Sequence, residues 1–218
     1  MSKKQSRQQN WTSWHHLLHK EILGNENLIP EGANLLIAVS GGQDSMALLN
    51  LINDMKKQHN WFVTVWHGDH QWHEKSETYA LELKSYCNEK NISFLFDRAD
   101  KKTISSEDKA RDWRYRQLSE RANQLILENQ KEIDIYLLTG HTNTDNAETF
   151  LLNLARGSNY AGLSYIEKKR VIKQNIFLIR PLLIFSREDT KNFCNFSNIP
   201  IWEDPTNYDL KIKRNLVR

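Results

Sequence analysis

Residues 35–50 read LLIAVSGGQDSMALLN, and this stretch decides the fold. Its first five residues are all apolar, as expected for a central strand of a parallel sheet that is covered on both faces. The Ser-Gly-Gly sequence at 40–42 then permits a tight bend. Apolar residues after the bend recur at the spacing of one helix face, so we predict that a helix begins near Asp44 or Ser45.

The bend is predicted to bind phosphate. The first turn of a helix presents backbone N–H groups without internal partners, and the helix dipole adds partial positive charge there. The hydroxyls of Ser40 and Ser45 can add hydrogen bonds. Asp44 would repel a bare phosphate unless a divalent cation lay between them, so Asp44 indicates Mg²⁺ and ATP. The loop is not a Walker A loop, because it lacks the lysine and the four-residue spacer.

Length and composition favour a single α/β domain with at most a small appendage. The 30 basic and 27 acidic residues give a net charge of +3, which does not by itself require a nucleic-acid partner. The two cysteines belong to no CxxC or Cys/His cluster, so we expect neither disulfides nor structural zinc. No apolar run approaches the ~20 residues of a membrane span. We therefore expect a cytoplasmic protein without a membrane partner.

Strands and helices are predicted to alternate after the first strand. The predicted strands cover 61–66, 92–96 and 135–138, and the predicted helices cover an apolar stripe at 80–87 and a longer one at 110–126, with a further amphipathic helix before the first strand at 11–22. This alternation predicts a three-layer α/β fold, with a mostly parallel twisted sheet and helices on both faces, of the Rossmann type. Ligands of such sheets gather beyond the carboxyl ends of the strands.

Three histidines and Asp69 follow the second predicted strand, at 67–73. A spacing of three on a strand or loop does not bring the rings together, so a metal site is not favoured there. Contact with substrate or nucleotide, and a purely structural role, both stay open.

The fourth predicted strand runs into TGHTNTDNAET at 139–149. A helix is predicted to begin near Asn143 or Thr144, which places Asp145 in its first turn and Glu148 nearly one turn later. Both carboxylates should then face the phosphate site. Helix capping alone would also explain Thr144 and Asp145.

The loop SGGQDS resembles the SGGxDS signature of the PP-loop ATP pyrophosphatases, which split ATP between the α and β phosphates. From about residue 35 to its end, the chain is similar to the amino-terminal catalytic domain of the tRNA(Ile)-lysidine synthases. The further matches, in order, are AR-x-x-RY at 110–115, H-x-x-D-x-AET at 141–149, RGS-x-x-x-GL at 156–163, RPLL at 180–183 and W-x-DP-x-N…RN-x-x-R at 202–218. Several ordered motifs together are far more specific than any one of them.

The resemblance implies an enzyme that attaches free L-lysine to C2 of the wobble cytidine in an isoleucine tRNA with a CAU anticodon. ATP and Mg²⁺ would serve an adenylated tRNA intermediate, and AMP and pyrophosphate would be released. The residues implied to bind the nucleotide are Ser40, Gly41, Gly42, Gln43, Asp44, Ser45 and His141, with Asp44 also holding the metal.

The other implied roles follow from residue type. Arg111 and Arg114 share a helix face, so one or both could stabilise charge on the α-phosphate and join Asp44 and Asp145 as catalytic residues. Asp145 and Glu148 would bind the lysine ammonium group, and either could help remove its proton. The candidates for contact with tRNA or the lysine carboxylate are Arg180, Arg187 and Arg214, with solvated surface as the alternative.

We predict a disordered segment at 1–10, the catalytic domain at 11–186 and a helical extension or start of a linker at 187–218. Family members continue further, so a truncated chain is expected. The chain also departs from the family where Gln71, Trp72 and His73 follow Asp69 and His70 in place of a DHG motif with an arginine two residues later.

Two other classes of protein stay open. The first is another PP-loop adenylating enzyme, either a tRNA thiolase or an amide ligase. Thiolation needs a reactive cysteine near the site, whereas Cys87 and Cys194 lie on apolar helical patterns typical of a core. The second is a truncated, non-catalytic nucleotide-binding module. The sequence also leaves homodimer formation open.

Overall fold

The computed structural model describes residues 11–24, 28–100, 104, 106–129, 132–155, 157 and 165–202. The segment predicted to be disordered, 1–10, and residues 203–218 lie outside this part of the chain. In chain order its elements are α1 (Ser13–Ile22), β1 (Asn34–Ala38), α2 (Gln43–Met55), β2 (Phe62–Asp69), α3 (Ser76–Glu89), β3 (Ser93–Arg98), α4 (Glu107–Glu128), β4 (Ile135–Leu138), α5 (Asn143–Ala155), β5 (Lys169–Lys173), β6 (Ile176–Ile179), the 3₁₀ helix η2 (Pro181–Ile184) and α6 (Arg187–Phe196). Among the described residues, no helix combines the length and the apolar character needed to cross a bilayer.

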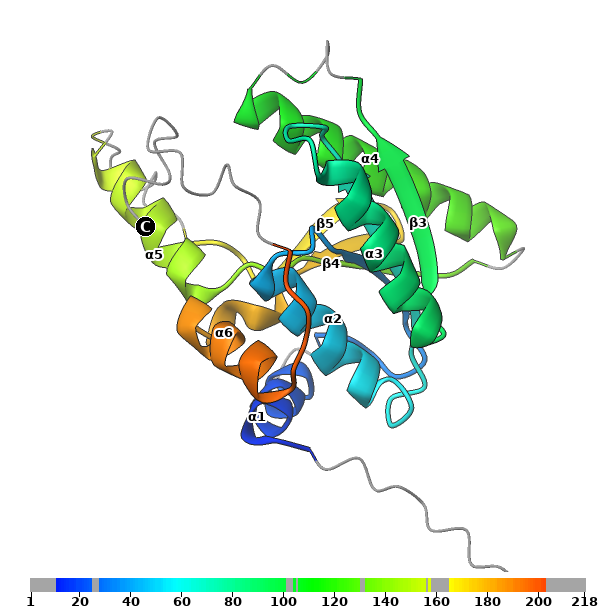
Figure 1. The fold of residues 1–218 in the computed structure, drawn as a ribbon. Coiled ribbons are helices and arrows are strands. Elements are labelled where there is room, and N and C mark those ends of the chain that lie inside the picture. The colour runs from blue at the N-terminus through cyan, green and yellow to red at the C-terminus, as the bar shows by residue number, and fades with distance from the viewer. Residues whose placement is uncertain are drawn as a thin grey trace, which may run out of the picture.

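The strands form one six-stranded sheet in the order β3-β2-β1-β4-β6-β5 (Figure 1). All neighbouring pairs are parallel except β5 and β6, which confirms the predicted mostly parallel sheet. The strand β1 lies between β2 and β4. The chain therefore builds the sheet outward from β1 in one direction and then, from β4 on, in the other. A crevice forms at such a reversal, beyond the carboxyl ends of β1 and β4.

Apolar side chains fill both faces of the sheet, as the uninterrupted run in β1 predicted. Leu35 and Ile37 are buried in a cluster with α1, α2, α3 and α6, whereas Leu36 is buried in a second cluster with α4. Neighbouring strand residues point to opposite faces, so a strand that is covered on both sides is apolar at every position. Figure 1 shows α2 and α3 on one side of the sheet and α4 on the other. The three-layer α/β fold is thereby confirmed.

The strands differ from the prediction in two places. The strand β2 continues to Asp69, so His67 and Asp69 lie in the strand and not in the loop after it. The hairpin of β5 and β6 was not predicted, because a basic run at 168–173 lacks the apolar pattern of a buried strand. That run forms the edge strand β5, where charged side chains discourage pairing with another chain.

The helix expected in the C-terminal extension is α6, and it is part of the domain core. Phe193 and Cys194 of α6 are buried in the cluster that contains α2, and the ring of Phe193 lies 5.7 Å from that of Trp14 in α1. A domain boundary after residue 186 would cut through this cluster. We therefore place α6 inside the catalytic domain, while 203–218 lie outside the described residues.

Candidate active site

The loop between β1 and α2 lies at the carboxyl end of β1, where the strand order reverses. Gly41 has φ +93°, a conformation that side chains other than that of glycine rarely adopt. Gly42 is the N-cap of α2, which begins at Gln43 as the apolar spacing predicted. The backbone N–H of Trp202 donates to the carbonyl of Gly41 at 3.0 Å, which ties the end of the described chain to this loop. The first turn of α2 thus opens at the carboxyl edge of the sheet.

Two side chains of the loop are already engaged within the protein. The hydroxyl of Ser45 donates to the carbonyl of Gly42 at 2.8 Å and accepts from the N–H of Ser40 at 3.2 Å. It would have to rotate to donate to a phosphate. The Gln43 amide donates to the carbonyl of Arg187 at 2.7 Å, so this side chain connects α2 to α6. Any contact of Gln43 with the nucleotide would therefore come from its backbone N–H.

His67 supports this loop from the neighbouring strand, a role that the sequence did not reveal. Its ring is buried, and Nδ1 donates to the carbonyl of Val39 at 2.7 Å, directly before the loop. The ring also stacks on Phe96 of β3. Burial lowers the pKa of His67, although its bond to Val39 and the nearby charge of Asp69 oppose the shift. A neutral ring with its proton on Nδ1 is the form that fits this position.

We expect the free energy of unfolding to decrease below pH 6.5, the ordinary pKa of histidine. The unfolded chain takes up a proton on His67 near that pH, whereas the folded chain does so only at lower pH. The stabilisation is therefore complete above pH 6.5 and is lost as the pH falls through the folded pKa. Urea titrations between pH 8 and 5 would measure it. His67→Gln should show a weaker pH dependence, and the exposed His16→Gln should behave like the wild type.

Gly140 lets the loop after β4 approach the first turn of α2. A Cβ placed on Gly140 would lie 3.0 Å from the backbone C and O of Asp44 and from the N of Ser45. These neighbours are backbone atoms and cannot rotate away. The glycine therefore sets the distance between the two loops that form the crevice.

We predict that Gly140→Ala shifts the start of α2 by a few tenths of an ångström and lowers ATP-dependent turnover by about tenfold, since small misplacements of reacting groups cost large factors in rate. Steady-state rates with varied ATP would measure this. Gly24→Ala, at the end of α1, is the control and should keep wild-type turnover. Equal rates for Gly140→Ala and the wild type would contradict the proposed close approach.

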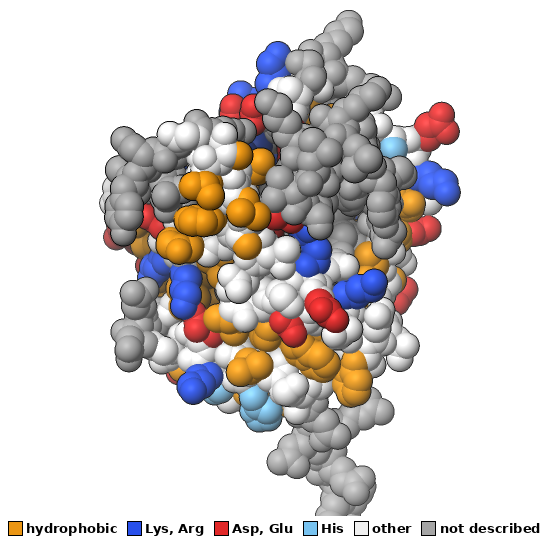
Figure 2. All heavy atoms as spheres, turned by 90° about the vertical axis from the view of Figure 1, so that its left-hand side faces the viewer, with side chains coloured by type: hydrophobic (Ala, Val, Ile, Leu, Met, Phe, Trp, Pro, Cys, Tyr) orange, Lys and Arg blue, Asp and Glu red, His pale blue; other side chains and the backbone are white. Residues whose placement is uncertain are grey.

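The helix α5 has its acidic residues buried and several of its leucines exposed. Among its described side chains, Asp145 and Glu148 are buried, with 4% and 3% of their surface exposed, whereas Leu151 and Leu154 are 48% and 53% exposed. Figure 2 views this side of the molecule and shows apolar side chains on its surface. Buried carboxylates are unfavourable unless they are paired, so both residues need partners from outside α5.

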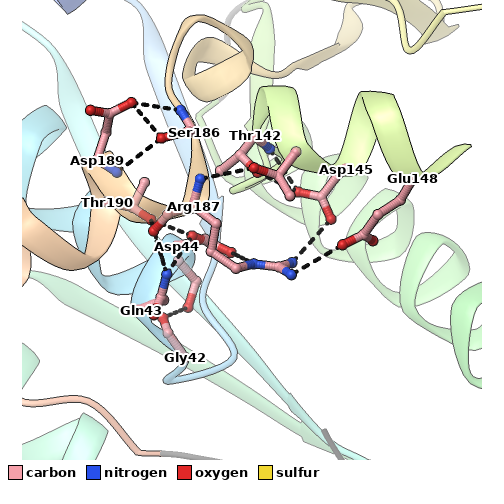
Figure 3. Close-up of polar contacts among 12 residues, drawn as sticks. Gly42, Gln43, Asp44, Thr142, Asp145, Glu148, Ser186, Arg187, Asp189 and Thr190 are labelled. Atoms are coloured by element: carbon pink, nitrogen blue, oxygen red, sulfur yellow. Dashed lines mark hydrogen bonds and ion pairs between the residues drawn. The ribbon is translucent and has the colours of Figure 1, made fainter. Parts of the chain in front are cut away.

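A shallow hollow of about 320 Å³ lies on another face of α5. It is lined by Asn143, Asn146, Ala147, Phe150, Leu151 and Tyr165. Asp145 and Glu148 are not among these residues, because they point from α5 toward α6 (Figure 3).

Asp145 contributes to the cap of its own helix and also contacts Arg187. Helix capping and a place in the site, the two interpretations of this residue, are therefore compatible. One oxygen, Oδ2, accepts from the N–H and the hydroxyl of Thr142 at 2.8 and 2.9 Å. The helix cap is thus completed by Thr142 and not by Thr144. The hydroxyl of Thr144 accepts instead from the N–H of Arg187 at 3.1 Å. These bonds leave the second oxygen of Asp145 to point into the crevice.

Arg187 joins the acidic residues of three elements (Figure 3). Its Nε donates to Asp44 Oδ2 at 3.2 Å, its Nη2 to Asp145 Oδ1 at 3.3 Å and its Nη1 to Glu148 Oε1 at 3.2 Å. Burial opposes the charged form of the guanidinium, but the three carboxylates, led by Asp44, raise the pKa of Arg187 above its ordinary value. We call these four residues the acidic cluster. It carries three negative charges and one positive charge beside the predicted phosphate loop.

The other predicted site residues lie outside the acidic cluster. Arg111 is stacked over Tyr115 within α4, and Arg114 lies 3.4 Å from the ring of His70, so their described contacts are with α4 and the end of β2. The ring of His141 is 2.9 Å from the hydroxyl of Thr139.

Of the arginines predicted to contact tRNA or the lysine carboxylate, Arg180 is described by the structure and Arg214 is not. Arg180 is buried, which excludes solvated surface, and its Nη1 donates to the carbonyl of Glu167 at 2.6 Å. Its Nε is buried without a hydrogen-bond partner. Arg214 lies outside the described residues.

The chain's two cysteines are core residues, as their apolar surroundings predicted. Both are buried and unbonded. Burial raises the pKa of Cys87 to about 11 and that of Cys194 to about 12. Both thiols therefore stay protonated near neutral pH, which makes them poor nucleophiles.

In the described part of the chain, no group of three or more metal-binding side chains is arranged to hold an ion. At the departure from the family motif after β2, Asp69 has a basic partner from the neighbouring strand. Arg98 of β3 donates from Nε to the buried Asp69 at 2.9 Å. A cation therefore accompanies Asp69 even though the expected arginine is absent from 71–73.

A phosphate-type loop after the first strand, at the reversal of a parallel sheet, defines a nucleotide-binding α/β domain. A family model described as a PP-loop domain matches residues 15–218, and the chain belongs to this family. Members of this family use ATP, as the resemblance implied.

The chain is also similar to curated proteins named tRNA(Ile)-lysidine synthase. It is 84% identical over 218 residues to the one from Prochlorococcus marinus subsp. pastoris, covering all of this chain and 65% of the relative. It is 49% identical to the protein from another strain of Prochlorococcus marinus, covering 92% of this chain and 62% of the relative. The chain thus spans less than two thirds of the length of these relatives.

Among solved structures, the U34-tRNA thiolase NcsA from Methanococcus maripaludis has a TM-score of 0.71 at 16% identity, covering 94% of this chain and 69% of that one. At this identity the likeness shows a common fold.

Proposed function

We propose that this chain is the catalytic part of an enzyme that ligates lysine to C2 of the wobble cytidine of an isoleucine tRNA with a CAU anticodon. The proposal is supported by 84% identity to a relative with the name of that activity. The observation that carries it is the acidic cluster beside the phosphate loop. A reaction between ATP and an amine needs adjacent sites for an anion and for an ammonium group, and the first turn of α2 and the pair Asp145–Glu148 offer both.

The proposed reaction has two balanced steps. In the first, O2 of the cytosine attacks the α-phosphorus of ATP, and pyrophosphate leaves. In the second, the lysine amine attacks C2 of the activated base, and AMP leaves with the oxygen. The protein contributes by holding the reacting groups together and by neutralising charge. Asp145 and Glu148 would bind the ammonium group and accept a proton before attack.

Mg²⁺ is part of the proposal, with Asp44 as its protein ligand. A metal of this kind is usually held by one or two carboxylates together with substrate phosphates, and it neutralises their charge. The residues present fit this requirement, because Asp44 lies in the first turn of α2 and the acidic cluster has more negative than positive charge. Arg111 and Arg114 are proposed to contact the α-phosphate or the tRNA, and Arg187 the lysine carboxylate or the nucleotide.

Incubation with labelled lysine, ATP and isoleucine tRNA of CAU anticodon tests the proposed function. Label on the tRNA supports it. Pyrophosphate exchange that depends on another acceptor would indicate a different adenylating enzyme, and nucleotide binding without turnover would indicate a binding module. The protonated state of Cys87 and Cys194 speaks against a thiolase that uses either of them. A cytoplasmic location is retained as part of the proposal, although the relative from Pyropia yezoensis is named as chloroplastic.

A further inference from the structure

Arg187 occupies the place where the proposed function puts the ammonium group of the amino acid. Each of its three nitrogen atoms donates to a different carboxylate, at 3.2, 3.3 and 3.2 Å, and two of these carboxylates belong to α5 (Figure 3). Asp145 and Glu148 are almost fully buried. A second cation would have to compete with the guanidinium for these oxygens, and like charges so close together repel each other. The Arg187 side chain therefore occupies the site that is proposed to bind an amine.

Asp44 links this arrangement to the nucleotide site. Its Oδ1 accepts from the hydroxyl of Thr190, and its Oδ2 accepts from Arg187. A metal ion that binds Asp44 would compete with these two donors for its oxygens and would repel the positively charged one, Arg187. Thr190 is buried in α6 and is also bonded to the carbonyl of Arg187, whereas the Arg187 side chain is long and is 26% exposed. The guanidinium is thus the donor that can move.

The amine pocket would survive the departure of Arg187. Oδ2 of Asp145 is held by the N–H and hydroxyl of Thr142, and this bond pair does not involve Arg187. Two buried carboxylates without a cation are unfavourable in a medium of low polarity, so an incoming ammonium group would be strongly attracted. Triphosphate at the start of α2 would in turn attract the displaced guanidinium.

We propose that Arg187 is a latch that keeps the amine pocket closed until a nucleotide binds. Nucleotide and its metal ion at Asp44 draw the Arg187 guanidinium away from Asp145 and Glu148 of α5, and the pocket then accepts the ammonium end of the amino acid. This inference rests on the proposed function for the identity of the amine. It predicts positive coupling between nucleotide and amine, because each ligand favours the state in which Arg187 has left α5.

Isothermal titration calorimetry on the full chain tests the latch. L-lysine and n-butylamine are titrated into wild type and Arg187→Gln, each with and without Mg²⁺ and a non-hydrolysable ATP analogue. n-Butylamine has the ammonium end without the carboxylate, so a lost contact between Arg187 and the carboxylate cannot hide the effect. In the wild type we expect the analogue to strengthen amine binding about tenfold or more, within the usual range of coupling between sites. In Arg187→Gln the ratio should fall toward one.

Arg121→Gln is the matched control, since Arg121 forms a two-point ion pair with Asp97 on the α4 side of the sheet. In Arg121→Gln, the ATP analogue should strengthen amine binding by the same factor as in the wild type. If Arg187→Gln does not fold, as judged by circular dichroism, Arg187→Lys replaces it. A lysine reaches fewer of the carboxylates, so its coupling should be intermediate.

Equal coupling in wild type and in the Arg187 variant would overturn the latch, as would the absence of amine binding in both. Transfer of lysine to tRNA with unchanged coupling would leave the proposed function standing without the latch. Coupling that n-butylamine shows and that Arg187→Gln abolishes would support the latch even if the tRNA assay failed.

Discussion

Asp44→Asn is expected to reduce ATP-dependent release of pyrophosphate by at least about 100-fold, the usual loss when a group that stabilises developing charge is removed. Asp44 lies in the first turn of α2 and is the proposed Mg²⁺ ligand. The amide keeps the size of the side chain but removes its charge. The fold should persist, because Asn can still accept the hydrogen bond from Thr190. Pyrophosphate release at saturating Mg²⁺ and ATP is the measurement.

Asp54→Asn is the matched control for this prediction. Asp54 lies on the same helix, two turns or more from the loop, and its carboxylate is 3.3 Å from Nε2 of His15. Its removal changes the charge of α2 by the same amount without touching the crevice. We expect near wild-type turnover. Wild-type pyrophosphate release by Asp44→Asn would exclude the proposed metal role of Asp44.

Asp145→Asn should raise the KM for lysine by about 10- to 100-fold, as expected for the loss of a hydrogen bond to a charged group worth about 1.5–3 kcal/mol. The KM for ATP should change much less, because Arg187 stands between Asp145 and Asp44 of the nucleotide loop. The amide oxygen can still accept from Thr142, so the start of α5 should persist. Steady-state kinetics with lysine and ATP varied separately would show the difference.

Asp189→Asn is a close control for Asp145→Asn, because Asp189 caps α6 in the same way. Its Oδ2 accepts from the N–H and hydroxyl of Ser186 at 2.8 and 2.7 Å. A change that followed only from weaker capping would appear in both variants. A selective rise in the lysine KM of Asp145→Asn would locate the effect in the amine pocket. An unchanged lysine KM would remove Asp145 from that pocket.

Several features of the site could be predicted from short-range sequence patterns. The strand β1, the bend and the start of α2 follow from an apolar run, two glycines and a helical repeat within 16 residues, and β4 and the start of α5 follow in the same way. The prediction that Asp145 and Glu148 face one site rests on their spacing of three on a helix, and the structure brings both to Arg187.

Other features depend on contacts between segments that are far apart in the chain. The role of His67 follows from a strand pairing that places it beside Val39, and the need for glycine at 140 follows from the approach of two loops. The packing of α6 is another such feature, because its apolar residues Phe193 and Cys194 are buried only in the core that includes α2, across the predicted domain limit at 186.

The sequence by itself determined the alternating strands and helices from β1 to α5, the bend before α2 and the placing of two acidic residues on one face of α5, because these depend on local periodicity and turn chemistry. Only the tertiary structure decided that Arg187 lies among Asp44, Asp145 and Glu148. Residues 44, 145 and 187 are brought together by the reversal of strand order and by the packing of α6 on α2. Neither can be predicted from a single sequence. Charges that are far apart along the chain attract each other appreciably only after folding has brought them close in space.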